Sequence, residues 1–269
     1  MRRAPPSRAG PSLKARPPVS QEPPSHTVIN PDGRPEWVLL CDHASRYVPT
    51  RLANLGLDEA ALHRHIAWDI GAGAVAERVA ALTDAPLVMA GFSRLVIDAN
   101  RPLGDPTSIA KTSDGVAIPG NAAIGAAEAR ARAEAYFWPY HRAIESLLAA
   151  IEARGAKPAL LPIHSFTPIM QGFERPWQIG ILWDRDRRLA DPLLAYFNAN
   201  PSLTVGDNQP YSGASPASYS LKEHGDRRGR PHASIEIRQD LIDTPAGVET
   251  WARLVADALR NIRPPGAAL

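Results

Sequence analysis

The chain has 269 residues, which is enough for one large α/β domain with a sizeable core. Its 30 Lys and Arg nearly balance its 28 Asp and Glu, so the net charge of +2 provides no basic face for nucleic acid. The single Cys41 excludes an internal disulfide and a cysteine-rich zinc site. Because no apolar stretch approaches the roughly twenty residues needed to cross a bilayer, we expect a cytoplasmic protein without a membrane span.

The first 33 residues differ from the rest of the chain. They are rich in Pro and Arg and contain few large apolar residues, so they bury too little surface to offset the entropy lost on ordering. We therefore predict a disordered N-terminal tail over residues 1–33 and one catalytic domain over residues 34–265.

From Trp37 onward, short apolar runs alternate with stretches in which apolar residues recur three and four positions apart. This alternation predicts an α/β sheet covered by helices. Strands are predicted over residues 37–41, 86–89, 95–98, 159–164, 178–182, 204–205 and 233–237, and helices over 58–82, 123–154, 187–199, 214–224 and 245–262. Pro139 predicts a kink or a break near Trp138 in the longest helix. The loop 102–122 has no periodicity, and its length is typical of a functional loop.

Two histidines stand at the ends of predicted strands. His43 follows the run 37–41, and His164 ends the run 159–164. Ligands of open α/β sheets bind at the carboxyl ends of strands, and neutral imidazole is a good zinc ligand. If the two strands are neighbours, the histidines form a metal site; otherwise each is held by a loop carbonyl.

The predicted strand 233–237 carries a candidate proton acceptor. Ile235 and Ile237 alternate with Glu236 and Arg238, so the period of two places the charged side chains opposite the isoleucines. Metal-assisted hydrolysis needs a carboxylate that accepts and returns a proton. The alternative is an edge strand with a solvated Glu and Arg.

The predicted strand 95–98 delivers Asp98, Asn100 and Arg101 together. A guanidinium binds a carboxylate through two parallel hydrogen bonds, and a neighbouring amide adds donors, so Asn100 and Arg101 are candidates for a carboxylate clamp. The alternative is an Arg101 that pairs with an acid to hold the loop.

Taken in order, these segments resemble the N-formylglutamate amidohydrolase family, a distant relative of the zinc carboxypeptidases and aspartoacylases. The similarity runs from about residue 37 to 262. Besides the segments above, it includes AWDIGA at 67–72, residues 137–141, NQPYSG at 208–213 and residues 224–225.

The resemblance implies a fold and a cofactor. The fold is a single α/β domain with a central mixed, largely parallel sheet flanked by helices on both faces, as in the zinc carboxypeptidases (phosphorylase/hydrolase-like). The cofactor is zinc, held by His43 and His164, with Glu236 as the catalytic group. The carboxypeptidase pattern places a Glu ligand three residues after the first His, where this chain has Arg46. We expect Asp69, on an early helix, as the third ligand, with Asp42 as the alternative.

The resemblance also implies a small-molecule substrate, an N-formyl or N-acyl amino acid such as N-formyl-L-glutamate, cleaved to formate and the free amino acid. Asn100 and Arg101 would bind its α-carboxylate, Arg94 or Arg238 a side-chain carboxylate, and His224 another part of the substrate.

Two alternatives remain open. One is a carboxypeptidase-like or aspartoacylase-like hydrolase that acts on another N-acyl amino acid or on a peptide. The other, favoured by Arg46, is a metal-free binding or regulatory protein on the same fold. The sequence makes no prediction about the oligomeric state.

Overall fold

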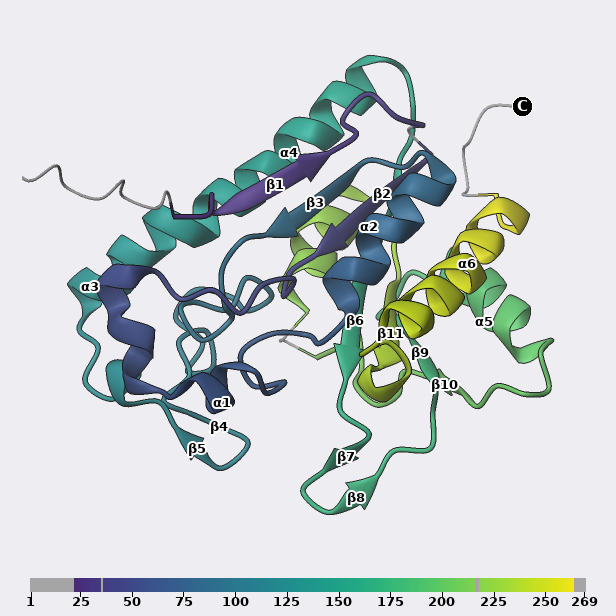
Figure 1. Ribbon diagram of the computed structural model, residues 1–269. Coiled ribbons are helices and arrows are strands. Elements are labelled where there is room, and N and C mark those ends of the chain that lie inside the picture. Colours follow the sequence, from purple (N-terminus) through teal and green to yellow (C-terminus); the bar gives the residue numbers. More distant parts are fainter. Residues whose placement is uncertain (1–21, 35, 216–217, 264–269) are drawn as a thin grey trace, which may run out of the picture.

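A seven-stranded sheet forms the centre of the computed structural model, which describes residues 22–34, 36–215 and 218–263 (Figure 1). The strands in spatial order are β1 (His26–Ile29), β3 (Leu87–Ala90), β2 (Trp37–Cys41), β6 (Ala159–Phe166), β11 (Ser234–Arg238), β9 (Ile179–Leu182) and β10 (Val205–Asp207). The four strands β3, β2, β6 and β11 are parallel, whereas β1 and the pair β9–β10 run the other way. The predicted mixed, largely parallel sheet of a single α/β domain is confirmed.

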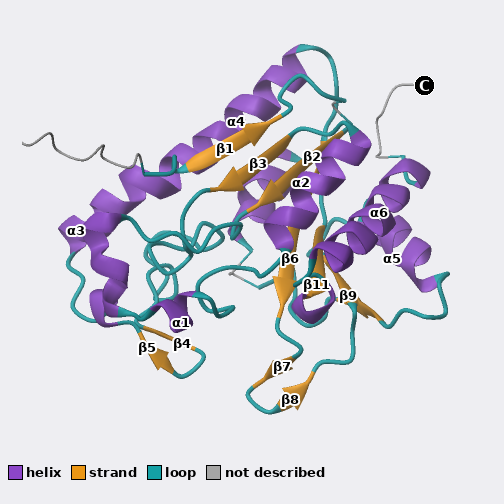
Figure 2. Ribbon diagram, viewed as in Figure 1, coloured by secondary structure: helices purple, strands orange, loops and turns teal. Residues whose placement is uncertain are grey.

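Helices cover both faces of this sheet (Figure 2). The α-helices are α1 (Glu59–Leu62), α2 (Ala72–Thr83), α3 (Ala126–Arg132), α4 (Trp138–Ala153), α5 (Ala190–Asn198) and α6 (Pro245–Asn261). Alternation within β2 separates two cores, because Leu39 packs with α2, α5 and α6 while Leu40 packs with α4. None of the helices in the described ranges is long and apolar enough to cross a bilayer.

Shorter elements complete the chain. The 3₁₀ segments are Thr50–Gly56, Pro119–Asn121, Asp226–Arg228 and Gln239–Leu241, and the π-helical turns are η3 (Ala133–Phe137) and η4 (Leu221–Gly225). The chain also forms two short hairpins outside the central sheet (Figure 1). The first pairs β4 (Thr112–Ser113) with β5 (Val116–Ala117), and the second pairs β7 (Ile169–Met170) with β8 (Phe173–Glu174).

The predicted tail boundary at residue 33 is wrong. Residues 26–29 form β1, which pairs antiparallel with β3 at the edge of the sheet. The strand is missed because its side chains are half-buried or exposed, so the segment lacks the apolar run that marks a central strand. The rest of the predicted tail, residues 1–21, lies outside the described residues.

Residues 95–98 do not form the predicted strand. Leu95, Val96 and Ile97 are buried, but their backbone groups bond to partners outside the sheet. The carbonyl of Leu95 accepts from Asn121, the carbonyl of Val96 accepts from Arg132, and the N–H of Asp98 donates to Ser108. A short apolar run shows burial, whereas a strand also needs a neighbouring strand as its partner.

The predicted helix 58–82 is interrupted between α1 and α2. Gly71 has a φ of 79°, and a Cβ built on it would lie 2.2 Å from the carbonyl oxygen of Ile242, so only glycine fits this turn. Asp69 therefore lies in the loop that precedes α2, not on a helix. The loop is fixed by a hydrogen bond from the N–H of Asp69 to the carbonyl of His43.

The predicted break near Trp138 takes the form of the π-helical turn η3, which joins α3 to α4. Pro139 lacks an N–H and its ring crowds the carbonyl four residues earlier, and a wider turn relieves both conflicts. The chain thus remains helical from Ala126 to Ala153.

Gly180 in β9 offers a test of close packing beside β11. It pairs with Glu236, and a Cβ built on it would lie 1.9 Å from the carbonyl oxygen of Gln209. We expect Gly180→Ala to lower the free energy of unfolding by about 1–3 kcal/mol in chemical denaturation, because the overpacked segment must shift. The control Gly125→Ala, whose Cβ meets no described residue within 4 Å, should change this free energy by less than about 0.5 kcal/mol. Equal free energies of unfolding for the two variants would contradict close packing at Gly180.

Candidate metal and active site

Three adjacent parallel strands bring the candidate chemistry together. His43 lies two residues after β2, His164 lies within β6, and Glu236 lies within β11 directly opposite His164 in register. Ile235 and Ile237 face the core on the other side of the sheet, as the period of two predicted. The carboxyl ends of these strands therefore form one site.

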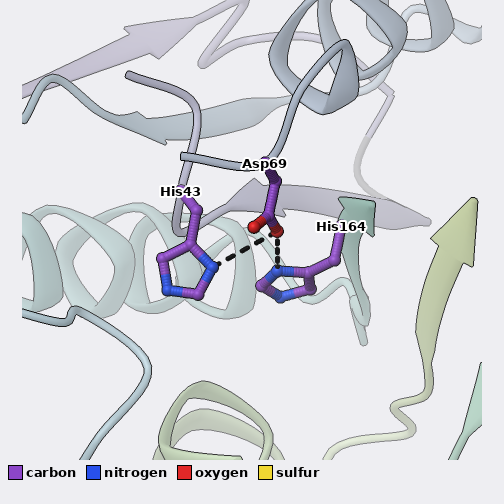
Figure 3. Close-up of side chains that lie close together, drawn as sticks. All are labelled: His43, Asp69 and His164. Atoms are coloured by element: carbon purple, nitrogen blue, oxygen red, sulfur yellow. Dashed lines mark hydrogen bonds and ion pairs between the residues drawn. The ribbon is translucent and has the colours of Figure 1, made fainter. Parts of the chain in front are cut away.

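The loop before α2 adds Asp69 to the two histidines (Figure 3). Asp69 Oδ2 lies 2.8 Å from His164 Nδ1 and 3.3 Å from His43 Nδ1. One ligand atom from each of the three residues lies within 4.8 Å of the others, and all three side chains are buried. Two imidazoles and a carboxylate are a donor set that suits a catalytic zinc ion, which keeps a further coordination position open.

The outer nitrogens of both histidines face carboxylates. His43 Nε2 lies 2.7 Å from Asp98 Oδ1, and His164 Nε2 lies 3.2 Å from Asp42 Oδ2. The first contact is a hydrogen bond, while the second is within ion-pair distance. A carboxylate on the outer nitrogen fixes the tautomer that leaves the inner Nδ1 free to bind a metal. Asp42, the alternative third ligand, is thus placed behind His164.

Hydrogen bonds hold both outer carboxylates. Asp42 Oδ1 accepts from the hydroxyls of Tyr140 and Ser220, each at 2.7 Å. Asp98 Oδ2 accepts from Nε and Nη2 of Arg94 at 3.0 and 2.7 Å, and Arg94 Nη1 reaches Asp69 Oδ1 at 3.3 Å. Arg94 therefore braces two carboxylates of the site.

The protonation of the buried groups follows from their partners. Burial alone would raise the pKa of Asp69, but the charges of His43 and His164 outweigh it and hold that pKa well below its usual range. Burial likewise opposes the charged form of His164, and its close contacts with the carboxylates of Asp42 and Asp69 overcome it and raise the pKa of His164. The cluster stabilises positive charge at the two imidazoles, the place that a metal ion would take.

Glu236 differs from the other acids. Burial raises the pKa of Glu236 to about 7, with the nearby His164 opposing that shift. Its Oε2 is buried and has no hydrogen-bond partner among the described residues. A buried carboxylate with a free oxygen and a pKa near neutrality is suited to accept and return protons.

A cavity of about 440 Å³ opens over these groups, which is a typical size for a small-molecule site. Its walls include all three predicted ligands, Glu236, and the substrate candidates Arg94, Asn100 and Arg101. Asn100 Oδ1 accepts from the N–H of Ser220 at 3.0 Å, which orients the amide so that its Nδ2 is left to donate to a ligand.

The loop 102–122 forms part of the cavity wall through residues such as Thr107 and Asp114. It is anchored by Asn121, whose Nδ2 donates to the carbonyls of Leu95 and Ala110, and whose Oδ1 accepts from Arg132 at 2.7 Å. The expectation that this loop serves the site agrees with its position.

Two predicted substrate residues lie away from the cavity wall. Arg238 pairs with Asp240 and donates to the carbonyl of Arg175 at 3.4 Å. His224 is buried between His141 and Glu145. Arg238 lies on the same face of β11 as Glu236, but Asp240 and the carbonyl of Arg175 hold its guanidinium. His224 lies in η4, where His141 and Glu145 hold its ring.

Arg46, the departure that favoured a metal-free protein, is also absent from the cavity wall. Its Nη1 pairs with Glu59 at 3.0 Å on the surface. The cation that replaces the expected Glu ligand therefore leaves the three donor atoms undisturbed.

The sequence pattern did not reveal the outer carboxylates. The sequence marked Asp98 as polar but gave it no role. The hydrogen bond from Tyr140 to Asp42 joins residues 98 positions apart, which no local pattern can predict. One signal was available for Asp98, since Arg94 lies four residues before it and pairs with it.

A family model and two solved structures resemble this chain. A family model described as N-formylglutamate amidohydrolase matches residues 36–243. The crystal structure of a gene product from Agrobacterium tumefaciens has a TM-score of 0.86 and 37% sequence identity, over 89% of this chain and 95% of that one. An N-formylglutamate amidohydrolase from Ralstonia eutropha has a TM-score of 0.62 and 23% identity, over 88% and 96%. A search of curated proteins gives no significant match.

Proposed function

Because the chain belongs to the N-formylglutamate amidohydrolase family, we propose that it is a zinc-dependent enzyme that hydrolyses N-formyl-L-glutamate, or a related N-acyl amino acid, to the acid and the free amino acid. The observation that carries this proposal is the convergence of His43, Asp69 and His164 beside Glu236, whose Oε2 has no hydrogen-bond partner in the part of the chain that the structure describes. A catalytic metal site needs both parts, a donor set and a proton acceptor.

Zinc, when held by His43, Asp69 and His164, supplies positive charge that polarises an amide carbonyl and makes water more acidic. Glu236 Oε2 takes a proton from the attacking water, whose oxygen forms the new bond to the acyl carbon. Glu236 then gives this proton to the departing amine nitrogen as the C–N bond breaks. Because Glu236 Oε2 is buried and has no hydrogen-bond partner among the described residues, one carboxyl group is placed to perform both transfers.

The clamp residues orient the substrate. Asn100 and Arg101 both line the cavity, and an amide beside a guanidinium suits the α-carboxylate of the amino acid. Arg94 also lies there, but its donors are directed at Asp98 and Asp69. We therefore assign Arg94 to the support of the metal site rather than to a side-chain carboxylate.

The proposal is tested by metal content together with activity. Protein purified without chelator should contain one zinc per chain by mass spectrometry and release formate from N-formyl-L-glutamate, and a chelator should abolish both. Faster cleavage of N-acetyl-L-aspartate or short peptides would instead identify an aspartoacylase-like or carboxypeptidase-like enzyme. Protein that binds no zinc and cleaves none of these substrates would overturn the proposal.

The acid limb of the pH profile provides a further prediction. The pKa of Glu236 is raised to about 7, so the ionised base is lost as the pH falls through that value. A bound cation favours the carboxylate and lowers this pKa, so kcat/KM should fall on acidification with a midpoint at or below about 7. Steady-state kinetics between about pH 5 and 9 measure this limb. Activity that increases toward acid would exclude Glu236 as the base.

A further inference from the structure

The cavity wall carries few cations. Among the described residues that line the cavity, Arg94 and Arg101 are the only Lys or Arg. N-formyl-L-glutamate has two carboxylates, and in a partly enclosed site each needs a cation or several donors as its partner. The cations that can meet a substrate therefore limit the number of carboxylates that it can carry. Against them stand five carboxyl groups on the same wall, those of Asp42, Asp69, Asp98, Asp114 and Glu236.

The charge of Arg94 is already balanced within the protein. Its Nε and Nη2 donate to Asp98 Oδ2 at 3.0 and 2.7 Å, and its Nη1 donates to Asp69 Oδ1 at 3.3 Å. Every nitrogen of the guanidinium thus bonds to a carboxylate. If Arg94 turned to a substrate, the buried Asp98 behind His43 would lose its cation, and an uncompensated buried charge is strongly unfavourable.

Two other guanidiniums close to the site are held by protein groups, and neither is part of the cavity wall. Nε and Nη2 of Arg238 donate to the two oxygens of Asp240 at 2.8 and 3.2 Å. Nη1 of Arg175 donates to the carbonyl of Thr167 at 3.3 Å and to the hydroxyl oxygen of Tyr211 at 3.1 Å. Tyr211 lines the cavity, so the side chain that a substrate meets here is a neutral phenol.

His65 is a further basic side chain on the wall, and it also provides no second partner. Its Nε2 lies 3.5 Å from Asp114 Oδ2, which accepts from Arg64 at 2.8 Å. Burial lowers the pKa of His65, so its ring is uncharged at neutral pH. The carboxylate of Asp114 beside it repels a second substrate carboxylate.

The remaining wall offers uncharged contacts. Phe166 ends β6, Thr167 follows it, and Met170 lies in β7 of the hairpin. Tyr211 faces them from the loop before η4, and because its oxygen accepts from Arg175, its own proton is left to donate. Aromatic, thioether and hydroxyl groups suit an uncharged side chain, which meets them without the loss of an ionic partner.

We propose that the cavity binds a single substrate carboxylate, at Asn100 and Arg101, and that the preferred substrate is an N-acyl amino acid with an uncharged side chain. The reaction rests on the proposed function, whereas the number of carboxylates bound does not. Asn100 and Arg101 hold the α-carboxylate, and the uncharged wall surrounds the side chain. The side-chain carboxylate of an N-acyl glutamate finds no cation there and lies near Asp114.

Three compounds of nearly equal size test this specificity. N-formyl-L-glutamine replaces the side-chain carboxylate of N-formyl-L-glutamate by an amide, and its isomer N-formyl-L-isoglutamine replaces the α-carboxylate instead. Formate release by wild-type protein purified without chelator should give a kcat/KM about tenfold or more higher for the glutamine compound than for the glutamate compound. The isoglutamine compound should be the poorest substrate. A glutamate compound cleaved as efficiently as the glutamine compound, or an isoglutamine compound equal to it, would overturn the proposal.

A cation added to the wall should reverse the preference. In Met170→Arg, kcat/KM for N-formyl-L-glutamate should rise about tenfold, while that for the glutamine compound changes little. The control Ile169→Arg adds the same charge one residue earlier, where the side chain is 53% exposed and lies off the cavity wall, so the ratio of the two kcat/KM values should stay the same. Met170→Lys serves if the arginine variant does not fold. An unchanged ratio in the Met170 variant, or the same change in both variants, would contradict the proposal.

Binding separates this proposal from the proposed function. Efficient cleavage of N-formyl-L-glutamate in preference to the glutamine compound would uphold the proposed function and overturn the single-carboxylate site. If the wild-type protein cleaves none of the three compounds, the proposed function fails, and titration calorimetry with the same compounds then decides the specificity. Tighter binding of N-formyl-L-glutamine would uphold the single-carboxylate site. Equal or tighter binding of N-formyl-L-glutamate, or no binding of any compound, would overturn it.

Discussion

Replacement of Glu236 by Gln is expected to lower kcat for N-formyl-L-glutamate by about 10²- to 10⁴-fold while zinc remains bound. The amide has nearly the same size but accepts no proton from water, and Glu236 is not one of the three converging donors. Formate release measures the turnover, and mass spectrometry measures the metal.

The same variant separates loss of chemistry from loss of folding. The pKa of Glu236 is raised to about 7 by burial, so above that pH the folded protein contains an ionised carboxylate that burial disfavours. Glu236→Gln should therefore unfold at the same or a higher temperature than the wild type at alkaline pH. The control Glu77→Gln, an exposed carboxylate on α2, should retain full turnover. Undiminished turnover of Glu236→Gln would exclude its role in proton transfer.

Loss of zinc from Asp69→Ala and His164→Ala, but not from Asp42→Asn, is the second expected result. The first two substitutions remove atoms that converge with His43, whereas Asp42 faces the outer nitrogen of His164. An Asn at position 42 disturbs the tautomer of His164, so it should weaken zinc binding by about 10- to 100-fold without abolishing it. Competition with a chelating indicator measures the affinities.

The pH dependence of zinc affinity provides an independent check that His164 binds the metal. Despite burial, the close carboxylates of Asp42 and Asp69 raise the pKa of His164, so the proton competes with the metal up to a higher pH than for a free imidazole. Zinc affinity should therefore fall as the pH decreases, with release of protons on binding. Circular dichroism verifies that each variant is folded. Zinc binding by Asp69→Ala equal to the wild type would remove Asp69 from the site.

Strands such as β2 and β9 were predictable because their runs are apolar on both faces, and β11 because Ile235 and Ile237 alternate with Glu236 and Arg238. Residues 37–41 form β2 as predicted, and β6, β9 and β11 lie within one or two residues of their predicted bounds. Burial without a partner strand produced the error at 95–98, and the exposed side chains of β1 concealed an edge strand. Helix α6 was predictable for the opposite reason, since its apolar face repeats over its whole length.

The candidate site was predictable in part. His43, His164 and Glu236 each stand where a local pattern of strand and polar residue points to chemistry, and the structure does bring all three to one cavity. Asn100 and Arg101 follow the same logic. Arg238 and His224 do not reach the cavity wall, because neighbouring groups hold their side chains: Arg238, the last residue of β11, bonds to the carbonyl of Arg175, and His224, in η4, bonds to Glu145.

The sequence by itself determined the short buried strands, the helices that cover them, and the polar residues that end the strands, because periods of two and 3.6 are local properties. Only the tertiary structure decided that β2, β6 and β11 are neighbours and that the loop before α2 carries Asp69 to His43 and His164. The same holds for Asp42 and Asp98 behind the histidines and for the buried partners of His224. These contacts join residues 26 to 178 positions apart, and a local pattern contains no information about which distant segment will pack against it.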